Sequence, residues 1–147
     1  MSDATLRPDL DEMLHNIPYA RFLGVRGELA GDELTLILPY SDHLIGNPTV
    51  PAIHGGVLGA LMEIAAIAQL TITQADAGNG GRRPRPIDIT VQYLRSARPV
   101  DTFARAQLRR VGRRIANVHV EAWQDARAAP VATLHGHFKM FSEGGQG

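Results

Sequence analysis

The spacing of apolar and polar residues changes along the chain and predicts different elements. The first segment, to about Asn16, repeats apolar residues with the 3.6-residue spacing of a short helix. Residues 24–39 alternate like two strands that turn at Gly31 and Asp32. Residues 40–53 contain two prolines and a Gly-Asn pair, which predicts an irregular loop. A loop of this length is more often functional than a short connection.

A second helix is predicted after the loop, where an apolar segment follows His54, Gly55 and Gly56 and ends at the break of residues 76–81. Because this helix is apolar nearly all round, other structure must enclose it. Its longest apolar stretch is 16 residues with Glu63 inside, which is shorter than the roughly 20 residues that cross a membrane. We therefore expect a buried helix and no membrane span.

Four later segments alternate with a period of two residues, which predicts an antiparallel sheet. The residues on one face of these segments are Ile87, Ile89, Val91 and Tyr93; Thr102, Ala104, Ala106 and Leu108; Ala116, Val118, Val120 and Ala122; and Ala132, Leu134, Phe138 and Met140. A curved antiparallel sheet of about six strands, wrapped around one long central helix, covers every apolar face. The fold class is thus α+β, with a short N-terminal helix.

Length and composition indicate one domain over residues 1–147, since 147 residues with 44% hydrophobic content are enough for a single core. We assign residues 1–20 to an N-terminal helical segment and residues 142–147 to a flexible tail. The chain has no cysteine and its first residues lack a basic-then-apolar run. A signal peptide, a disulfide scaffold and a thiolate metal site are therefore not expected, and the expected location is cytoplasmic.

The charges are unevenly distributed although the net charge is zero. Residues 82–114 contain ten arginines against Asp88 and Asp101, which predicts a basic surface. Nucleic acid is a poor partner for this surface, because no binding motif is present and only 5% of residues are aromatic.

Two stretches carry a family resemblance. The first is HGGVLGALMEIA, in which a carboxylate follows the histidine by nine positions, and the second is ITVQYLRSARP followed by a strand, VGRR and another strand. Together they resemble the hotdog-fold acyl-CoA thioesterases of the phenylacetate-pathway type, in the 4-hydroxybenzoyl-CoA thioesterase-like superfamily. The resemblance extends from about Gly24 to Met140.

The resemblance implies hydrolysis of an acyl-CoA thioester to a free acid and CoA, without a cofactor. It also implies a homodimer whose sheets join edge to edge, often paired into a homotetramer. In such dimers the active sites lie at the dimer interface, with the glutamate from one subunit and the glycine-rich helix start from the other.

Glu63 is the strongest catalytic candidate, because it is the only charged residue between His54 and Asp76. An unpaired carboxylate in apolar surroundings costs several kcal/mol or takes up a proton, so such a residue usually marks a functional site. Glu63 would act as general base on water or attack the carbonyl itself. The alternatives are an ion pair with an arginine of a partner subunit and exposure through a groove.

The helix start provides candidate donors for the thioester oxygen, since the first N–H groups of a helix have no partner within it. Gly55 and Gly56 carry no side chain that would keep a carbonyl away. The alternative is that the glycine pair only permits a tight turn or close packing. His54 is a further catalytic candidate, and its structural alternative is to cap the helix or bind a backbone carbonyl.

Two positions depart from the thioesterase pattern. Related enzymes commonly place Asn or Gln six residues before the histidine, but Pro48 stands there and Asn47 precedes it. Asn47 is therefore the candidate that orients substrate or water. Some relatives also carry a hydroxyl one turn after the acid, where this chain has Ile67.

The arginine-rich segment is the candidate site for the phosphates of coenzyme A, because guanidinium groups bind phosphate in a bidentate manner. Arg85 belongs to this segment, and a solvated surface is the alternative for each single arginine. The arginines predicted to bind substrate are Arg82, Arg83, Arg113 and Arg114.

Three other activities are considered. A dehydratase of β-hydroxyacyl thioesters would use His43 as base with Glu63, but the acid lies 20 residues after His43, against 14 in that family's pattern. His43 remains a candidate substrate-binding residue. A non-catalytic acyl-CoA-binding protein would gain nothing obvious from a buried carboxylate. Zinc hydrolysis is not expected, because His135 and His137 share a strand face without a convincing third ligand.

Overall fold

The computed structural model describes residues 9–78 and 83–141. The predicted tail at residues 142–147 and Arg82 lie outside these residues. The N-terminal segment forms two short helices, α1 (Leu10–His15) and α2 (Pro18–Leu23), where the sequence predicted one helix. Asp9 caps α1 by accepting from Asp11 N and Glu12 N. Pro18 starts the second helix, because proline lacks an N–H and fits the first helical position.

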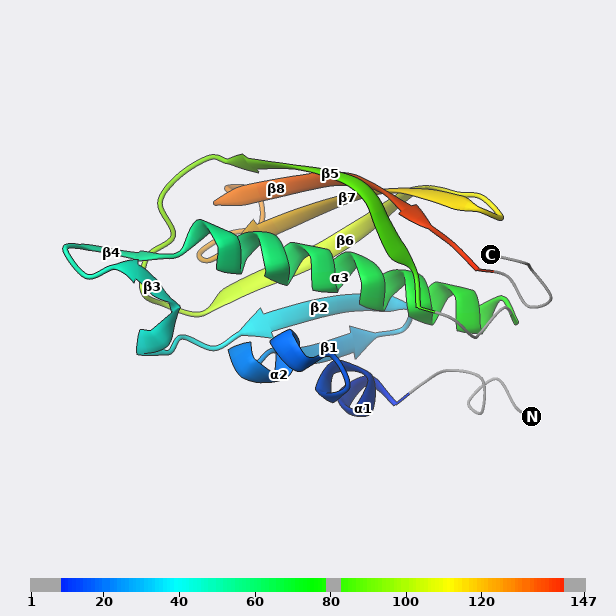
Figure 1. The fold of residues 1–147 in the computed structure, drawn as a ribbon, viewed down its shortest axis with the longest axis horizontal. Coiled ribbons are helices and arrows are strands. Elements are labelled where there is room, and N and C mark those ends of the chain that lie inside the picture. The colour runs from blue at the N-terminus through cyan, green and yellow to red at the C-terminus, as the bar shows by residue number, and fades with distance from the viewer. Residues whose placement is uncertain (1–8, 79–82, 142–147) are drawn as a thin grey trace.

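The first two strands form the predicted hairpin. β1 (Arg26–Ala30) and β2 (Glu33–Leu38) pair in antiparallel register around a turn in which Gly31 has a φ of 67°. Positive φ favours glycine, which explains the residue at this turn. The two N-terminal helices lie beside this hairpin, at one side of the molecule (Figure 1).

The prediction of an irregular loop over residues 40–53 is wrong in part. The segment contains a short 3-10 helix, η2 (Asp42–Leu44), and a separate hairpin of β3 (Ile45–Asn47) and β4 (Val50–Ile53). Pro51 is tolerated in β4 because this strand pairs with one neighbouring strand only. A backbone hydrogen bond joins the two ends of this hairpin, since His54 N, just after β4, donates to Leu44 O, just before β3, over 2.8 Å.

The central helix α3 (Gly55–Asp76) is the predicted apolar helix. Its 22 residues satisfy the length and hydropathy of a membrane span, but most of the apolar stretch is buried inside the protein. The strands cover it as a curved sheet, so α3 is the core helix of the fold (Figure 1).

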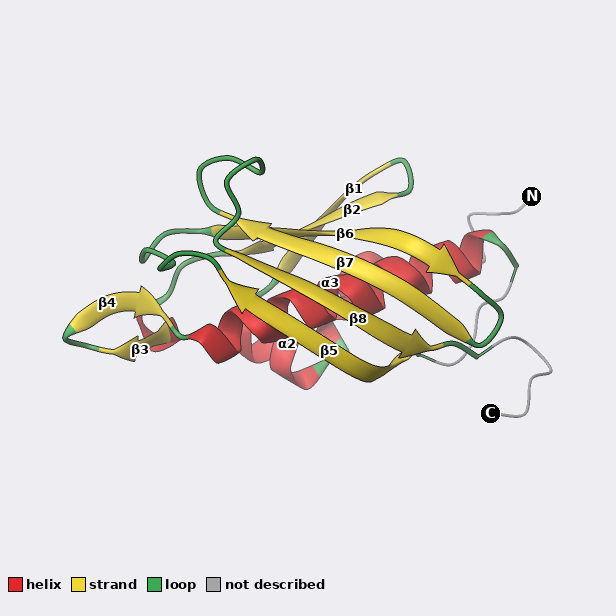
Figure 2. Cartoon of the chain, turned by 90° about the horizontal axis from the view of Figure 1, so that it is seen from above, coloured by secondary structure: helices red, strands yellow, loops and turns green. Residues whose placement is uncertain are grey.

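The remaining strands also match the prediction. They are β5 (Arg85–Tyr93), β6 (Thr102–Val111), β7 (Ile115–Trp123) and β8 (Ala132–Lys139). The six strands of the main sheet follow the order β1-β2-β6-β7-β8-β5 with antiparallel pairing, and Figure 2 shows the last four side by side over α3. The α+β fold with one central helix is therefore confirmed. β5 forms one edge of this sheet and has a neighbour on one side only.

Gln69 connects α3 to the β1–β2 hairpin and is almost fully buried. Its Oε1 accepts from Leu34 N over 2.9 Å, and its Nε2 donates to Asp32 O over 2.7 Å. Gln69→Ala should therefore lower the free energy of unfolding by about 2–4 kcal/mol, because buried backbone groups lose their partners. Urea denaturation measures this loss. Gln74→Ala is the matched control, since the side chain of Gln74 has no hydrogen bond to any described residue and is also buried; equal losses in both variants would refute the assigned role.

Candidate functional site

The start of α3 is capped by the histidine that directly precedes the helix. His54 is the N-cap residue, and its Nδ1 accepts from Gly56 N over 2.8 Å. Gly46 of β3 leaves room for the ring, since a Cβ at that position would lie 2.8 Å from His54 Cδ2. The structure thus shows the capping role that was the alternative for His54. The Gly56 N–H was predicted to donate to the substrate carbonyl, but in the structure it donates to the His54 imidazole.

Gly55 presents the other predicted donor. Its N–H has no hydrogen-bond partner in the part of the chain that the structure describes, and the residue is partly exposed. Tyr93, at the end of β5, covers the space that a side chain at Gly55 would fill: a Cβ there would lie 3.2 Å from Tyr93 Cε1 and Cζ. Of the two glycines, Gly55 is therefore the one whose amide is open to a ligand.

Glu63 lies two turns further along α3 and is partly exposed. Within residues 9–78 and 83–141 its carboxylate has neither a hydrogen bond nor an ion pair. Burial raises the pKa of Glu63 above the usual value of 4.5, because the charged form loses solvation without gaining a partner. An ion pair within the chain is thus absent from the described structure, and the carboxylate is a base of increased strength.

Gly55 and Glu63 lie on the same side of α3 but are far apart along it. Eight residues at a rise of 1.5 Å each separate them by about 12 Å along the axis. A thioester whose oxygen contacts the Gly55 N–H of one chain is therefore out of reach of Glu63 of the same chain. A donor for a substrate at Glu63 has to come from elsewhere.

The raised pKa of Glu63 makes a prediction about stability. The folded protein holds the proton of the Glu63 carboxyl more tightly than the unfolded chain does. The contribution of protonated Glu63 to the free energy of unfolding is therefore present at low pH and is lost as pH rises through the folded pKa. Glu63→Gln should therefore raise Tm at pH 7 and leave Tm nearly unchanged at about pH 4, where both side chains are neutral. Thermal unfolding at both pH values and equal protein concentration measures the difference; a wild type at least as stable as the variant at pH 7 would contradict a desolvated, unpaired carboxylate.

The two polar candidates of the 40–53 segment make local contacts. Asn47 Oδ1 accepts from the backbone N and the hydroxyl of Thr49, over 3.0 and 2.8 Å, and so closes the β3–β4 turn. His43 Nδ1 lies 2.8 Å from Ser41 Oγ, and its ring packs edge-on against Phe22 of α2. Neither residue contacts Glu63 in the described structure.

The candidate arginines that the structure describes lie directly before β5, at its first residue or in the β6–β7 turn, at the opposite end of the sheet from the start of α3 (Figure 1). Arg83 and Arg85 line a pocket of about 550 Å³ together with Ile67, Pro84, Pro86 and Phe141. Ile67 is one turn after Glu63 on α3, but Glu63 itself does not line this pocket. Arg113 and Arg114 belong to the β6–β7 turn, where Arg114 O accepts from Met140 N over 2.7 Å.

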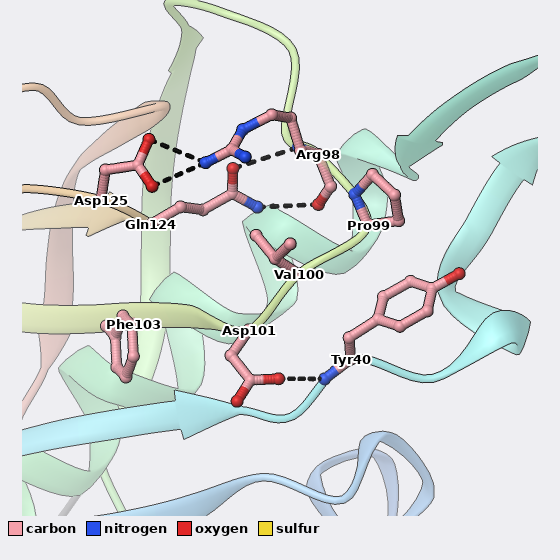
Figure 3. Close-up of a pocket in the computed structure, with 8 residues that line it drawn as sticks. All are labelled: Tyr40, Arg98, Pro99, Val100, Asp101, Phe103, Gln124 and Asp125. Carbon is pink, nitrogen blue, oxygen red and sulfur yellow. Dashed lines mark hydrogen bonds and ion pairs between the residues drawn. The ribbon is translucent and has the colours of Figure 1, made fainter.

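A second hollow, of about 540 Å³, lies where β2 and β7 end and β6 begins (Figure 3). Its charged groups already have partners: Arg98 forms an ion pair with Asp125, and Asp101 accepts from the backbone N–H of Tyr40 over 2.7 Å. Gln124 Nε2 donates to Arg98 O over 2.9 Å. None of the predicted site residues lines this hollow, and its polar groups are already paired, so it is not the candidate active site.

Three of the remaining histidines make side-chain contacts on β7, β8 and β5. His135 lies 3.2 Å from His119, and His137 Nδ1 lies 2.9 Å from Asp88 Oδ1. Among the described residues, no cluster of three or more His, Cys, Asp or Glu side chains is arranged to hold a metal ion.

Comparison with known proteins decides the family. The model of the acyl-CoA thioesterase N-terminal domain matches residues 46–138, a range that holds α3, β5, β6, β7 and all of β8 except its last residue. The chain belongs to the acyl-CoA thioesterase family. It is an acyl-CoA thioesterase, as the resemblance of the two sequence stretches implied.

One relative of known activity agrees with this assignment, and two solved structures have a similar fold. The medium/long-chain acyl-CoA thioesterase YigI of Escherichia coli K12 is 27% identical over 118 residues, which cover 74% of this chain and 76% of that protein. A solved structure from Chromobacterium violaceum is 32% identical, covers 89% of this chain and 88% of its own, and has a TM-score of 0.69. The E. coli PaaI protein of the phenylacetic acid degradation operon is 19% identical, covers 90% of each chain and shares the hotdog fold with a TM-score of 0.73.

The sequence did not indicate the hydrogen-bonding roles of Tyr93 and Gln69 in the thioesterase. The alternating pattern placed Tyr93 on the same strand face as Val91, which was a signal that it faces α3. Nothing in the pattern indicated that its hydroxyl would reach Gly55 O, 38 positions away in the sequence. Gln69 was an isolated amide in an apolar helix, and a buried amide requires partners.

Proposed function

We propose that the thioesterase hydrolyses acyl-CoA at a site built from Glu63 of one subunit and Gly55 N–H of a second copy. The observation that carries the proposal is the pair of unpartnered groups on α3, a desolvated carboxylate and a helix-start amide, about 12 Å apart along the axis. Because one helix cannot apply both groups to the same thioester, two antiparallel helices are needed.

The edge strand β5 supports a dimer of this kind. Four large apolar side chains on β5 or directly after it are exposed in the single chain. Their exposed fractions are 53% for Ile87, 37% for Ile89, 55% for Tyr93 and 51% for Leu94. An open edge with exposed apolar residues pairs readily with another strand. Pairing β5 with its copy would continue the sheet across two subunits and bring the two α3 helices side by side.

The proposed chemistry starts from the charged form of Glu63. As general base, Glu63 takes a proton from water while the water oxygen bonds to the thioester carbon, and the carbonyl electrons move onto oxygen. The Gly55 N–H donates to this oxyanion. The C–S bond then breaks, the carbonyl re-forms, and the thiolate of CoA receives the proton held by Glu63.

The nucleophilic alternative uses the same residues. Glu63 bonds to the thioester carbon, CoA thiolate leaves, and water hydrolyses the resulting anhydride.

The Gly56 N–H can join as a second donor only where the His54 ring releases it. Asn47 is proposed to orient substrate or water with its amide nitrogen, since its Oδ1 is bound to Thr49. His54 is proposed to act as the cap that shapes the helix start.

The basic end of the sheet is the proposed place for the phosphates of coenzyme A. Arg83 and Arg85 have no ion-pair partner among the described residues, and their pocket adjoins Ile67. Arg113 and Arg114 lie on the turn next to the end of β8. His43, on the other side of the molecule, contacts α2 and is proposed only as a substrate-binding residue of the partner's site.

Mixing two variants of low activity tests the shared site. Glu63→Gln and Gly55→Ala are combined, dissociated and reassociated, and release of free thiol is measured on short, aromatic and long acyl-CoAs. If each site takes one residue from each subunit, half of the dimers are mixed and each has one intact site, which restores about one quarter of wild-type activity. Activity that stays at the level of the separate variants would refute a site shared between subunits.

A further inference from the structure

Tyr93 binds the first turn of the central helix from the end of β5. Its hydroxyl donates to Gly55 O over 2.8 Å, although Tyr93 itself is more than half exposed. In an α-helix this carbonyl also accepts from the N–H four residues later, and its second lone pair is free for the tyrosine. The phenol therefore adds a tertiary bond to the helix start without replacing the helical one.

The peptide unit between Gly55 and Gly56 is held at both ends. Tyr93 binds its carbonyl oxygen, and His54 Nδ1 accepts from its N–H over 2.8 Å. The six atoms of a peptide unit are coplanar, so these two bonds fix the orientation of the whole plane. The Gly55 N–H belongs to the preceding peptide unit, whose carbonyl oxygen, His54 O, accepts from Val57 N over 2.9 Å. The two peptide planes that meet at Gly55 are thus both held by hydrogen bonds.

Two glycines in sequence would otherwise be the least restrained part of the site. Glycine loses more conformational freedom on folding than any other residue, and the first turn of a helix lacks half of its internal bonds. A donor that moves by about 1 Å can lose a large part of its catalytic effect. The Tyr93 ring also lies where a Cβ on Gly55 would be, so the ring restricts the same residue by packing.

We propose that Tyr93 is a positioning residue for the Gly55 N–H: its hydrogen bond to Gly55 O holds the peptide plane on the carbonyl side of Gly55 and so restricts rotation of this residue against the plane that carries its N–H. This inference rests on the proposed function of the Gly55 N–H as donor to the thioester oxygen. Tyr93 acts through the backbone of Gly55 and does not itself contact the reacting atoms.

Tyr93→Phe removes the hydroxyl and keeps the ring. It should lower kcat about ten-fold and leave KM nearly unchanged. A misdirected donor weakens the stabilisation of the transition state more than it weakens binding of the substrate. Tyr19→Phe is the matched control, since Tyr19 is also exposed and its hydroxyl has no hydrogen bond to any described residue. Steady-state thiol release by both variants, with sedimentation to confirm an unchanged oligomeric state, measures the effect. A wild-type kcat in Tyr93→Phe would overturn the inference.

A double-mutant cycle separates positioning from a general structural role. In a Gly55→Ala background the ring has already been displaced, so Tyr93→Phe should change kcat by roughly two-fold or less. The same ten-fold loss in both backgrounds would show that Tyr93 acts independently of Gly55 and would overturn the inference. Failure of the proposed function is recognised separately, because Glu63→Gln would then keep its activity whatever Tyr93→Phe does.

Discussion

Replacing Glu63 by glutamine is expected to lower thioester turnover by at least about 10²-fold. The amide has nearly the same shape as the carboxylate but neither accepts a proton from water nor attacks a carbonyl. Since Glu63 is without a hydrogen bond or ion pair among the described residues, the change breaks no structural contact. The loss should therefore appear in kcat, with substrate binding and folding retained.

The control for this variant is Glu28→Gln, which neutralises an exposed glutamate on β1. Thiol release and Tm are compared for both variants, and Glu28→Gln should match the wild type. The pH dependence adds a further check, because the acidic limb of log(kcat/KM) should have its inflection above the ordinary pKa of glutamate. Near-normal turnover in Glu63→Gln would count decisively against the mechanism.

Gly55→Ala is expected to lower kcat/KM by about 10- to 10²-fold. The added methyl group would lie 3.2 Å from the Tyr93 ring, which is closer than nearly all contacts of a Cβ atom, and it would crowd the approach of the thioester oxygen to the amide. Both effects act on the same donor. Helix formation itself should not suffer, because alanine is the better helix former.

Gly59→Ala is the matched change one turn further along α3. A Cβ there would lie 3.7 Å from Tyr93 Oη and 3.9 Å from Val91 Cγ2, which are ordinary contacts. This variant should keep the activity of the wild type within a few-fold and unfold at an equal or higher temperature. If Gly59→Ala lost as much activity as Gly55→Ala, crowding of the whole helix face would explain both, and the specific role of the Gly55 amide would be refuted.

The periodic parts of the chain could be predicted from the sequence because their spacing reflects which face is buried. The alternation at Ala116, Val118 and Val120 matches three fully buried side chains of β7, and the apolar run after His54 matches α3. Glu63 was conspicuous for the same reason, as the one charge in that run. The family resemblance then implied the activity, and the comparison with known proteins confirmed the acyl-CoA thioesterase family.

The remaining features depend on contacts that periodicity does not encode. The β3–β4 hairpin was missed because its prolines and glycine signal a loop, whereas a two-stranded sheet with open edges tolerates them. The occupation of the Gly56 N–H by His54 depends on one side-chain rotamer. The exposure of the Ile87 and Ile89 face was not foreseen either, since a half-buried strand and an interface strand share the same alternation.

The most direct test of the central claim is a crystal structure of Glu63→Gln with bound acyl-CoA. We predict that the thioester oxygen lies about 2.7–3.1 Å from Gly55 N of one subunit. The side chain at position 63 of the other subunit should face the thioester carbon from the opposite side. A thioester bound away from both groups, for example in the hollow between Tyr40 and Arg98, would contradict the account.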